Sequence, residues 1–221
     1  MARRSRPSRG RDQTGGRVQA SPYVQRSLAF FDPLDEDSIE KLETQVDWIL
    51  QEVGIAFRDD PVALDLWRKE GAKIEGDIVT APADWIRALC RKAPSEFTQL
   101  ARNPERSVRI GGRNQVFAPI YGAPFVRDLE QGRRYGDMAA FHDLVKLSYM
   151  HPNLHHGGLV TVEPCDVPVS KRHLDMLLAH MTLSDKPHLG AITEMSRAQD
   201  SVDMAEILFG KEVMDENCVI M

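Results

Sequence analysis

The stretch NLHHGGLVTVEPCDVPVSKRHLDMLLAHMTLSDKPHLGAIT, residues 153–193, decides the fold class. Its two ends, 153–162 and 186–193, are short runs rich in apolar residues, which is typical of buried strands. Between them, residues 168–185 carry apolar side chains at helical spacing, namely Leu174, Leu177, Leu178 and Met181. Two buried strands joined through a helix form a parallel β-α-β unit, so the stretch predicts an α/β fold.

The same alternation extends in both directions along the chain. Residues 116–128 and 217–221 are predicted as strands, and residues 135–150 and 196–210 as helices. Either a barrel or an open doubly wound sheet fits this order. No G-x-G-x-x-G turn follows a predicted strand, which favours the N-terminal part of a TIM (β/α)8 barrel. A barrel needs about eight such units, so we expect the chain to be truncated.

Residues 23–115 have a different character and predict an α+β lead-in of helices and hairpins. The helical patterns cover 35–54, 59–72 and 82–94, and a Gly76-Asp77 turn joins two strands within 73–82. The domain prediction is therefore a disordered basic tail over 1–22, the lead-in over 23–115, and the first half of a barrel over 116–221.

Charge and composition exclude several classes of function. Six arginines and one acid give residues 1–22 a net charge of +5, which leaves −10 for the remainder of a chain whose total is −5. Because the body is acidic, nucleic acid is not the expected partner. No apolar run reaches the ~20 residues of a membrane span. The three cysteines lack a CxxC pair, so a reducing cytoplasm is the expected location.

In parallel α/β folds, chemistry lies at the carboxyl ends of the strands. The predicted strand ends carry the candidate substrate-binding residues Tyr121, Gly122, Phe125, Glu163 and Thr193. Pro119 and Pro124 interrupt regular pairing on either side of Tyr121, which would offer this ring to a cavity. The alternative is a bulged edge strand with Tyr121 packed in the core.

Polar residues near the second strand end leave two further alternatives open. Glu163 and Asp166 are a pair of carboxylates for acid-base work or for holding a cation, or else they are solvated and Asp166 caps the helix that begins near Pro168. Four histidines cluster in the sequence, namely His142, His151, His155 and His156. Their spacing matches no metal-ligand motif and they precede the strand end, so no metal site is predicted.

Several ordered segments resemble the trimethylamine methyltransferase family, which includes glycine betaine and other quaternary-amine methyltransferases. They are LETQVDWILQEVGIAF, ALDLWRKEGAKIEGDIVTAP, APSEFTQLARNPERSVRIGG, FAPIYGAPFVRDLEQGRR and VEPCDVPVSKRHLDMLLAHMTLSDKPHLGAITE. The resemblance runs from about residue 23 to residue 221. It implies a TIM-barrel enzyme that moves a methyl group from a methylated amine to the Co(I) of a corrinoid carried by a partner protein, with no corrinoid bound directly by this chain.

The resemblance has further consequences. Family members are much longer, so we expect this chain to be inactive alone and the full-length protein to be a homo-oligomer. Tyr121, Phe125 and Glu163 are suitable residue types for a quaternary ammonium, which is held by aromatic faces and carboxylates. Two other hypotheses remain: a metal-dependent hydrolase or lyase on the same barrel, and a truncated non-catalytic paralogue or gene fragment that acts as a binding or regulatory module.

Overall fold

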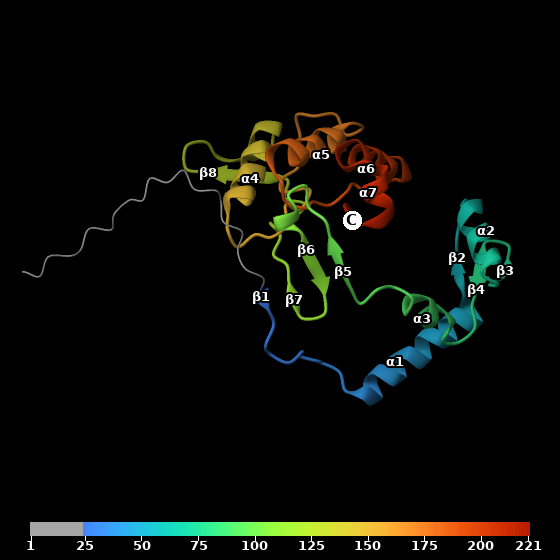
Figure 1. The fold of residues 1–221 in the computed structure, drawn as a ribbon. Helices are drawn as coiled ribbons and strands as arrows, with labels where there is room; N and C mark the ends of the chain where they lie inside the picture. Colours follow the sequence, from blue (N-terminus) through green and yellow to red (C-terminus); the bar gives the residue numbers. More distant parts are fainter. Residues whose placement is uncertain (1–23) are drawn as a thin grey trace, which may run out of the picture. The chain divides into compact units, whose positions relative to one another are not determined.

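The computed structural model describes residues 24–221, which divide into two compact units (Figure 1). The smaller unit comprises residues 27–95, and the larger comprises residues 24–26 together with 96–221. The predicted tail, residues 1–22, lies outside the described residues. In the part that is described, no helix has the length and apolar character needed to cross a membrane.

The smaller unit combines helices with a three-stranded antiparallel sheet. Its elements are α1 (Glu36–Trp48), the π-helical turn η1 (Ile49–Val53), β2 (Ile55–Ala56), α2 (Pro61–Lys69), β3 (Lys73–Glu75), β4 (Ile78–Thr80) and α3 (Trp85–Cys90). The strand order is β2-β4-β3, with Ile74 opposite Val79. The predicted helices and the predicted hairpin are therefore present in this unit.

Local capping explains where these helices begin. The Oδ1 atom of Asp35 accepts a hydrogen bond from the Ser38 amide at 2.9 Å, and Asp60 does the same for Ala63 at 2.9 Å. Each carboxylate satisfies an amide that has no partner inside its helix. Pro61 occupies the first turn of α2, where the missing N–H costs nothing.

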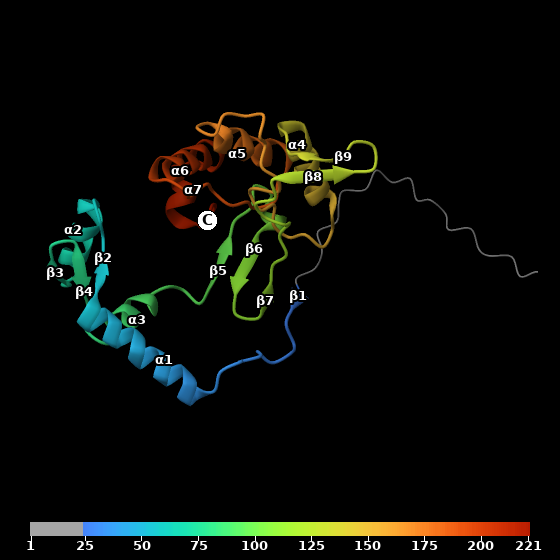
Figure 2. The same cartoon turned by 180° about the vertical axis from the view of Figure 1, so that it is seen from behind.

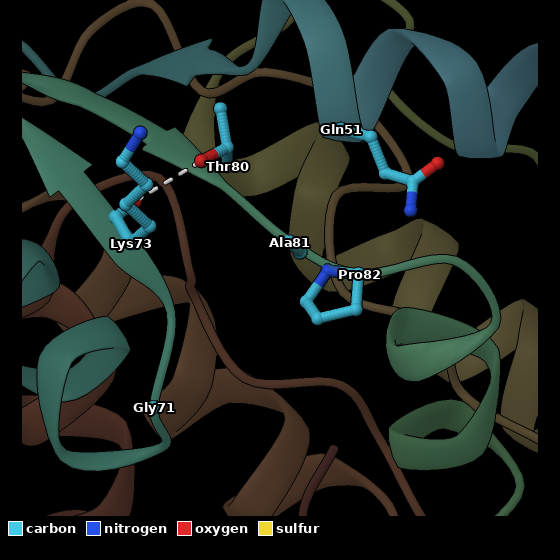
Figure 3. Close-up of a pocket in the computed structure, with 6 residues that line it drawn as sticks. All are labelled: Gln51, Gly71, Lys73, Thr80, Ala81 and Pro82. Atoms are coloured by element: carbon cyan, nitrogen blue, oxygen red, sulfur yellow. Dashed lines mark hydrogen bonds between the residues drawn. The ribbon is translucent and has the colours of Figure 1, made fainter.

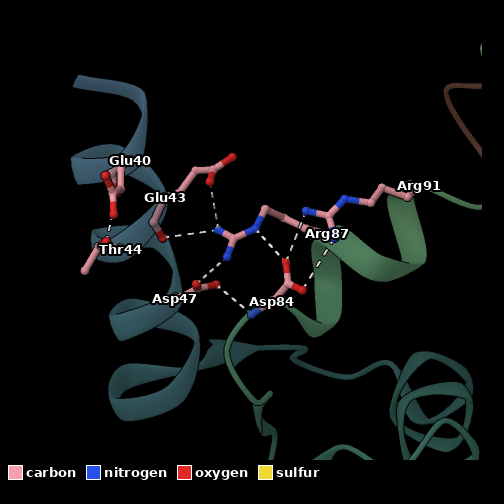
Figure 4. A network of polar contacts seen from close by, with 7 residues as sticks. All are labelled: Glu40, Glu43, Thr44, Asp47, Asp84, Arg87 and Arg91. Carbon is pink, nitrogen blue, oxygen red and sulfur yellow. Dashed lines mark hydrogen bonds and ion pairs between the residues drawn. The ribbon is translucent and has the colours of Figure 1, made fainter. Parts of the chain in front are cut away.

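An ion-pair network around Arg87 ties α3 to α1 inside the smaller unit (Figure 4). The guanidinium donates to Asp47 Oδ2 at 2.6 Å and to Asp84 Oδ1 at 3.1 Å, and it lies 3.9 Å from Glu43 Oε2. The hydrogen bond from Arg87 lowers the pKa of the Asp84 carboxyl. Arg87 and Asp47 are 40 residues apart in the sequence, so their contact joins two helices that are not consecutive.

The larger unit contains three small antiparallel pairs and four α-helices among its described residues (Figures 1 and 2). Its strands are β1 (Val24–Gln25), β5 (Glu96–Gln99), β6 (Val108–Gly111), β7 (Asn114–Gln115), β8 (Phe125–Asp128) and β9 (Gly132–Tyr135). The helices are η2 (Pro104–Arg106), which is a 3-10 turn, and α4 (Met138–Met150), α5 (Arg172–Leu183), α6 (Met195–Phe209) and α7 (Lys211–Glu216). The pairs are β1-β7, β5-β6 and β8-β9.

Four further segments of the larger unit lie side by side, and we call them the core segments: 117–124, 155–163, 187–193 and 218–221. The first joins the second through Gly122 N to Val160 O, at 2.7 Å. The second joins the third through Leu189 N to Gly158 O at 3.0 Å, and the third joins the fourth through Gly190 N to Met221 O at 2.7 Å. Residue numbers rise together from one hydrogen bond to the next between the first and second segments and between the second and third, so these two pairs are parallel, as expected.

The core segments are not the regular strands that the sequence predicts, so this part of the prediction is wrong. Within 116–128, only Phe125–Asp128 forms a strand, and it pairs with β9 in a hairpin that was not predicted. Prolines at positions 119, 124 and 187 have no N–H to donate, which breaks the ladders into single hydrogen bonds. The described residues form a mixed α/β structure and do not close a barrel.

The hydrophobic core of the larger unit lies between the core segments and the helices α4 and α5. Phe141 and Val145 from α4 and Leu177 from α5 are fully buried against Leu159 and Val162 of the second core segment. This contact places the helices outside the segments.

Candidate functional site

The parallel register brings the candidate residues to one end of the core segments. Glu163 donates its amide to Ala123 O at 2.9 Å, which places it beside the chain between Gly122 and Phe125. Leu189 on the third segment is hydrogen-bonded to Gly158 on the second. Thr193 follows Leu189 by the same number of residues as Val162 follows Gly158, so Thr193 and Val162 are at the same end of their segments. The candidate residues therefore follow the core segments at the same end, and Gly122 and Glu163 are on neighbouring segments.

Tyr121 is presented to the solvent at this end, since 59% of its surface is exposed. The alternative that Tyr121 packs in the core is wrong. Gly122 has a φ of 76°, a left-handed conformation that side chains strongly disfavour. This bend lets Gly122 donate to Val160 O while the preceding ring turns outward.

Glu163 is not a free carboxylate. Its Oε2 atom accepts a hydrogen bond from Arg172 Nη1 at 3.1 Å, and both side chains are partly buried. Arg172 is the first residue of α5, and its Nε and Nη2 atoms also donate to Val167 O at 3.3 and 3.0 Å. One guanidinium group thus connects the first residue of α5 to two residues of the loop that precedes it.

Phe125 and Thr193 also have arginine neighbours. The Arg133 guanidinium carbon lies 3.8 Å from the centre of the Phe125 ring, and the Tyr135 ring lies 4.6 Å from it. One face of Phe125 is therefore occupied by a cation. Thr193 is exposed and accepts a hydrogen bond from Arg197 Nη1 at 3.2 Å.

Asp166 is a structural residue, but its partner differs from the predicted one. Its Oδ1 atom accepts from the Met138 amide at 2.9 Å, so it caps α4 instead of the helix that follows it. Asp137 caps the same helix through Ala140 N at 2.7 Å. Gly136, just before them, has no space for a side chain, because a Cβ there would lie 2.6 Å from Glu163 O.

Of the three histidines with shifted pKa values, His156 and His188 lie at the opposite end of the core segments and His180 lies on α5. Burial lowers the pKa of His156 to about 4 and that of His188 to about 3, and it also lowers the pKa of His180. The buried Gln99 side chain accepts from His156 Nε2 at 3.0 Å and donates to His188 O at 2.9 Å. Gly158 N donates to His156 Nδ1 at 2.9 Å, which leaves the proton on Nε2. These neutral rings link β5 to the core segments.

Metal binding has no structural support among residues 24–221. No group of three His, Cys, Asp or Glu side chains there is arranged to hold an ion. His151 is exposed, and its Nδ1 atom accepts from the Asn153 amide at 3.2 Å. His155 Nδ1 accepts from Phe117 N at 3.1 Å. His151 and His155 are therefore each engaged by a backbone amide.

A hollow of about 320 Å³ in the smaller unit is a weaker candidate site (Figure 3). It is lined by Gln51, Gly71, Lys73, Thr80, Ala81 and Pro82. Lys73 is its one charged residue, and the neighbouring Glu75 raises the pKa of this amine, which keeps it positive. A hollow whose charge is positive and which has no aromatic lining is unsuited to a cationic amine.

Sequence reasoning missed the arginines of the carboxyl-end site and the role of Gln99. Arg172 could have been found from its place in the first turn of a helix that follows a strand-end glutamate. Arg133 follows an unrecognised turn at Gly132, whose φ of 69° marks the hairpin. No local signal identifies Gln99, because its partners are distant in the sequence.

The chain is similar to known methyltransferases over most of its length. A model of the trimethylamine methyltransferase (MTTB) family matches residues 2–221. The glycine betaine methyltransferase of Desulfitobacterium hafniense (strain Y51) is 41% identical over 195 residues, which are 88% of this chain and 40% of that protein. The proline betaine:corrinoid methyltransferase of Eubacterium limosum is 27% identical over 169 residues, 72% of this chain and 34% of that protein. The chain thus spans about two fifths or less of the length of these relatives.

Proposed function

Since this chain belongs to the trimethylamine methyltransferase family, we propose that it serves the transfer of a methyl group from a methylated amine to the Co(I) of a corrinoid carried by a partner protein. The observation that carries the proposal is the family match over residues 2–221. The names of the two relatives add support, because both are betaine methyltransferases and one of them is named for a corrinoid.

We also propose that the core segments are the first strands of a (β/α)8 barrel. Their parallel hydrogen bonds and the outer position of α4 and α5 support this architecture. Chemistry in such barrels lies at the carboxyl ends of the strands. Tyr121, Gly122, Phe125, Glu163 and Thr193 lie at that end and are the proposed substrate-binding residues.

The substrate dictates what these residues do. A quaternary ammonium has no N–H to donate, so it is held by an aromatic face and by negative charge. The exposed ring of Tyr121 supplies the face, and Glu163 supplies the charge. Arg133 occupies one face of Phe125, so this ring can offer only its other face or its edge.

The corrinoid supplies a Co(I) nucleophile that accepts the methyl group. The C–N bond breaks, and its electron pair stays on the nitrogen. A quaternary substrate thereby becomes a neutral tertiary amine. Because the product has lost its positive charge, its attraction to the Tyr121 ring and to Glu163 falls. The same residues that hold the substrate therefore release the product.

The test is methyl transfer by the native protein isolated from its source cells. The protein is mixed with a Co(I) corrinoid protein and with trimethylamine, trimethylglycine or proline betaine in turn. We expect loss of the Co(I) absorbance and formation of demethylated amine with at least one substrate. Absence of transfer from every methylated amine, with a corrinoid protein that accepts methyl groups from another enzyme, contradicts the proposal.

A further inference from the structure

The helix α1 carries an apolar stripe that faces solvent. Its members recur at intervals of three and four residues, so they lie along one side of the helix. They are Ile39, Leu42, Val46 and Ile49, and each is between 43% and 55% exposed. Neither α1 nor η1 has a buried residue. An amphipathic helix normally covers such a stripe by packing it on a neighbour, so this one is available to a partner.

The stripe continues into an apolar pocket of about 120 Å³. Leu50 follows Val46 by four residues, which places both on the same side of the helix, and Leu50 lines the pocket. Two walls of the pocket are the rings of Phe57 and Trp67, whose centres are 5.6 Å apart, and every other lining residue is apolar as well. An apolar cavity of ~150 Å³ holds a molecule as large as benzene. This pocket therefore suits one apolar side chain of a partner.

Acidic residues border the stripe. Residues 36–53 contain six acids and one lysine, which gives them a net charge of −5. Four of the acids follow one another at steps of four and three residues and form a row beside the stripe, namely Glu36, Glu40, Glu43 and Asp47. Arg87 pairs with Glu43 and Asp47 (Figure 4). Within the described part of the chain, Glu36 and Glu40 form no ion pair, so half of the row can meet positive charge from a partner.

We propose that the stripe, the pocket and the acidic row form one docking surface for a basic amphipathic helix of a separate partner protein. One apolar side chain of that helix fills the pocket, the others pack on the stripe, and its lysine or arginine side chains meet Glu36 and Glu40. Helices that bind in grooves use apolar residues at the same three- and four-residue spacing. The inference concerns the smaller unit and does not depend on the proposed methyl transfer.

Charge decides between this partner and a second copy of the chain. A second α1 offers a matching apolar stripe but brings the same net negative charge, and like charges brought together oppose association. The arginine-rich residues 1–22 have the required sign, but prolines apart they contain only Met1 and Val18 as apolar residues larger than alanine. A segment with so few apolar side chains cannot cover the stripe and fill the pocket. A helix that is basic and also apolar along one side meets both requirements.

The experiment uses three synthetic helical peptides that carry a fluorophore. The first has leucines at three- and four-residue spacing with lysines beside them, the second has glutamates in place of the lysines, and the third has serines in place of the leucines. Binding to the 221-residue chain is measured by fluorescence anisotropy. We expect the basic leucine peptide to bind at least about tenfold more tightly than either of the others. Added salt should weaken its binding, because screening reduces the attraction to the acidic row.

Variants locate the binding on α1. Val46→Gln removes an apolar contact at the centre of the stripe and should weaken binding of the basic leucine peptide about fivefold or more. Ile207→Gln is the matched control, since it removes an 87% exposed apolar residue from α6 and should leave binding unchanged. Glu36→Gln combined with Glu40→Gln should weaken the basic peptide and narrow its advantage over the acidic one. Circular dichroism and thermal melting check that each variant is folded.

The fluorescence of Trp67 reports whether the pocket is filled, because this ring is one of its walls. We expect the basic leucine peptide to shift the tryptophan emission to shorter wavelength, since a side chain in the pocket excludes water from the ring. Trp67→Phe keeps an aromatic wall and should remove most of this shift while the peptide still binds. An unchanged emission on binding contradicts the filled pocket.

Four further results overturn the inference. Equal binding of the basic and acidic peptides shows that charge does not select the partner. Absence of binding by all three shows that α1 is not a docking surface. Unchanged binding to Val46→Gln places the peptide elsewhere on the chain. Sedimentation that finds a dimer of the chain, which dissociates in Val46→Gln, shows that a second copy covers the stripe instead.

Discussion

At the scale of single residues, the pairing of Glu163 with Arg172 changes how the candidate site is understood. Sequence reasoning considered Glu163 with Asp166, as two carboxylates on one loop. In the structure, Asp166 caps α4 and Glu163 binds a guanidinium, so the two acids do not act together. A carboxylate held by arginine is suited to binding a ligand in a fixed orientation.

Tyr121 provides the first test at this scale. Replacement by Ala should weaken binding of a methylated ammonium substrate by roughly tenfold or more, because the aromatic face is lost. Tyr121→Phe keeps the face and should bind nearly as the wild type does. The measurement is the KM for the methylated amine in the methyl-transfer assay. Equal kinetics for wild type and Tyr121→Ala would exclude Tyr121 from the site.

The buried histidines predict how stability depends on pH. The folded-state pKa values of His156 and His188, about 4 and about 3, lie below the ordinary value of 6.5. Above pH 6.5, the imidazole rings are neutral in both the folded and the unfolded state, and their contribution to the free energy of unfolding is complete. As pH falls from 6.5 towards these values, only the unfolded state binds protons, so the free energy of unfolding falls.

Urea unfolding between pH 7.5 and 4.5 measures this effect. Each histidine contributes at most about 1.4 kcal/mol per pH unit. In His156→Gln the decline with pH should be shallower than in the wild type. The carboxyl pKa values of Asp35, Asp84 and Asp128 are lowered from 3.8. The stability that these carboxylates contribute is therefore lost only at lower pH. Parallel pH curves for the two proteins contradict the prediction.

At the scale of secondary-structure elements, α4 shows what local signals can and cannot predict. A helix was predicted over residues 135–150 and is found over Met138–Met150, with Phe141 and Val145 buried. Leu147 of the same helix is 62% exposed, and Leu178 of α5, which helical spacing placed with the apolar residues, is 52% exposed. Helical spacing locates the helix, but the elements packed against it decide how wide the buried face is.

The carboxyl end of α4 yields a test of helix stabilisation. Lys186 is buried, and its Nζ atom donates to Ser148 O at 2.8 Å and to His151 O at 3.1 Å. Burial lowers the pKa of this amine to about 8, so it is charged at neutral pH. A positive charge at these carbonyls stabilises the helix end.

Lys186→Met should therefore lower the free energy of unfolding by about 1–3 kcal/mol, because two buried carbonyls lose a charged donor. The matched control is Lys146→Met, which removes an exposed lysine paired with Asp143 on the same helix. This control should lose much less. Chemical denaturation at pH 7 measures both changes. Equal losses would show that the contacts of Lys186 contribute no more than a surface pair.

At the scale of the whole molecule, the two units differ in how much of their surface is buried. In the larger unit, Phe141, Leu159, Val162 and Leu177 are among the fully buried side chains. In residues 27–95, the buried hydrophobic residues are Ala72, Val79 and Ala81. Since buried apolar area is the main source of stability, the smaller unit should open more readily.

Hydrogen exchange with mass spectrometry tests this difference. Amides of the β2-β4-β3 sheet should exchange faster than those of α4 and α5 in the same protein. Arg87→Met removes the tie between α1 and α3, so exchange should rise further within residues 27–95 and stay unchanged in α4 and α5. Uniform protection across both units would contradict this prediction.

The family prediction is confirmed at this scale, since the family model and the betaine methyltransferases match most of the chain. The mixed α/β class is also as predicted, and a helix lies at each predicted helical range, but α7 was not predicted. Regular strands over the core segments were wrongly predicted, because apolar runs with glycine and proline resemble strands although their ladders are broken. The β8-β9 hairpin was missed because the turn around Gly132 is polar and does not separate two runs of apolar residues.

The sequence by itself determined the features that depend on a few neighbouring residues. The turn at Gly76 was predicted from spacing, and the caps at Asp35 and Asp60 are also local, since their hydrogen bonds close short loops. Only the tertiary structure decided the partners of Gln99, which binds His188 O and Val219 O across 89 and 120 residues. Such contacts form only after the intervening chain has folded, and many distant partners are compatible with the same local pattern. The candidate site depends on both kinds of information: the order of its segments was predicted, but the arginines beside Phe125, Glu163 and Thr193 are seen only in the tertiary structure.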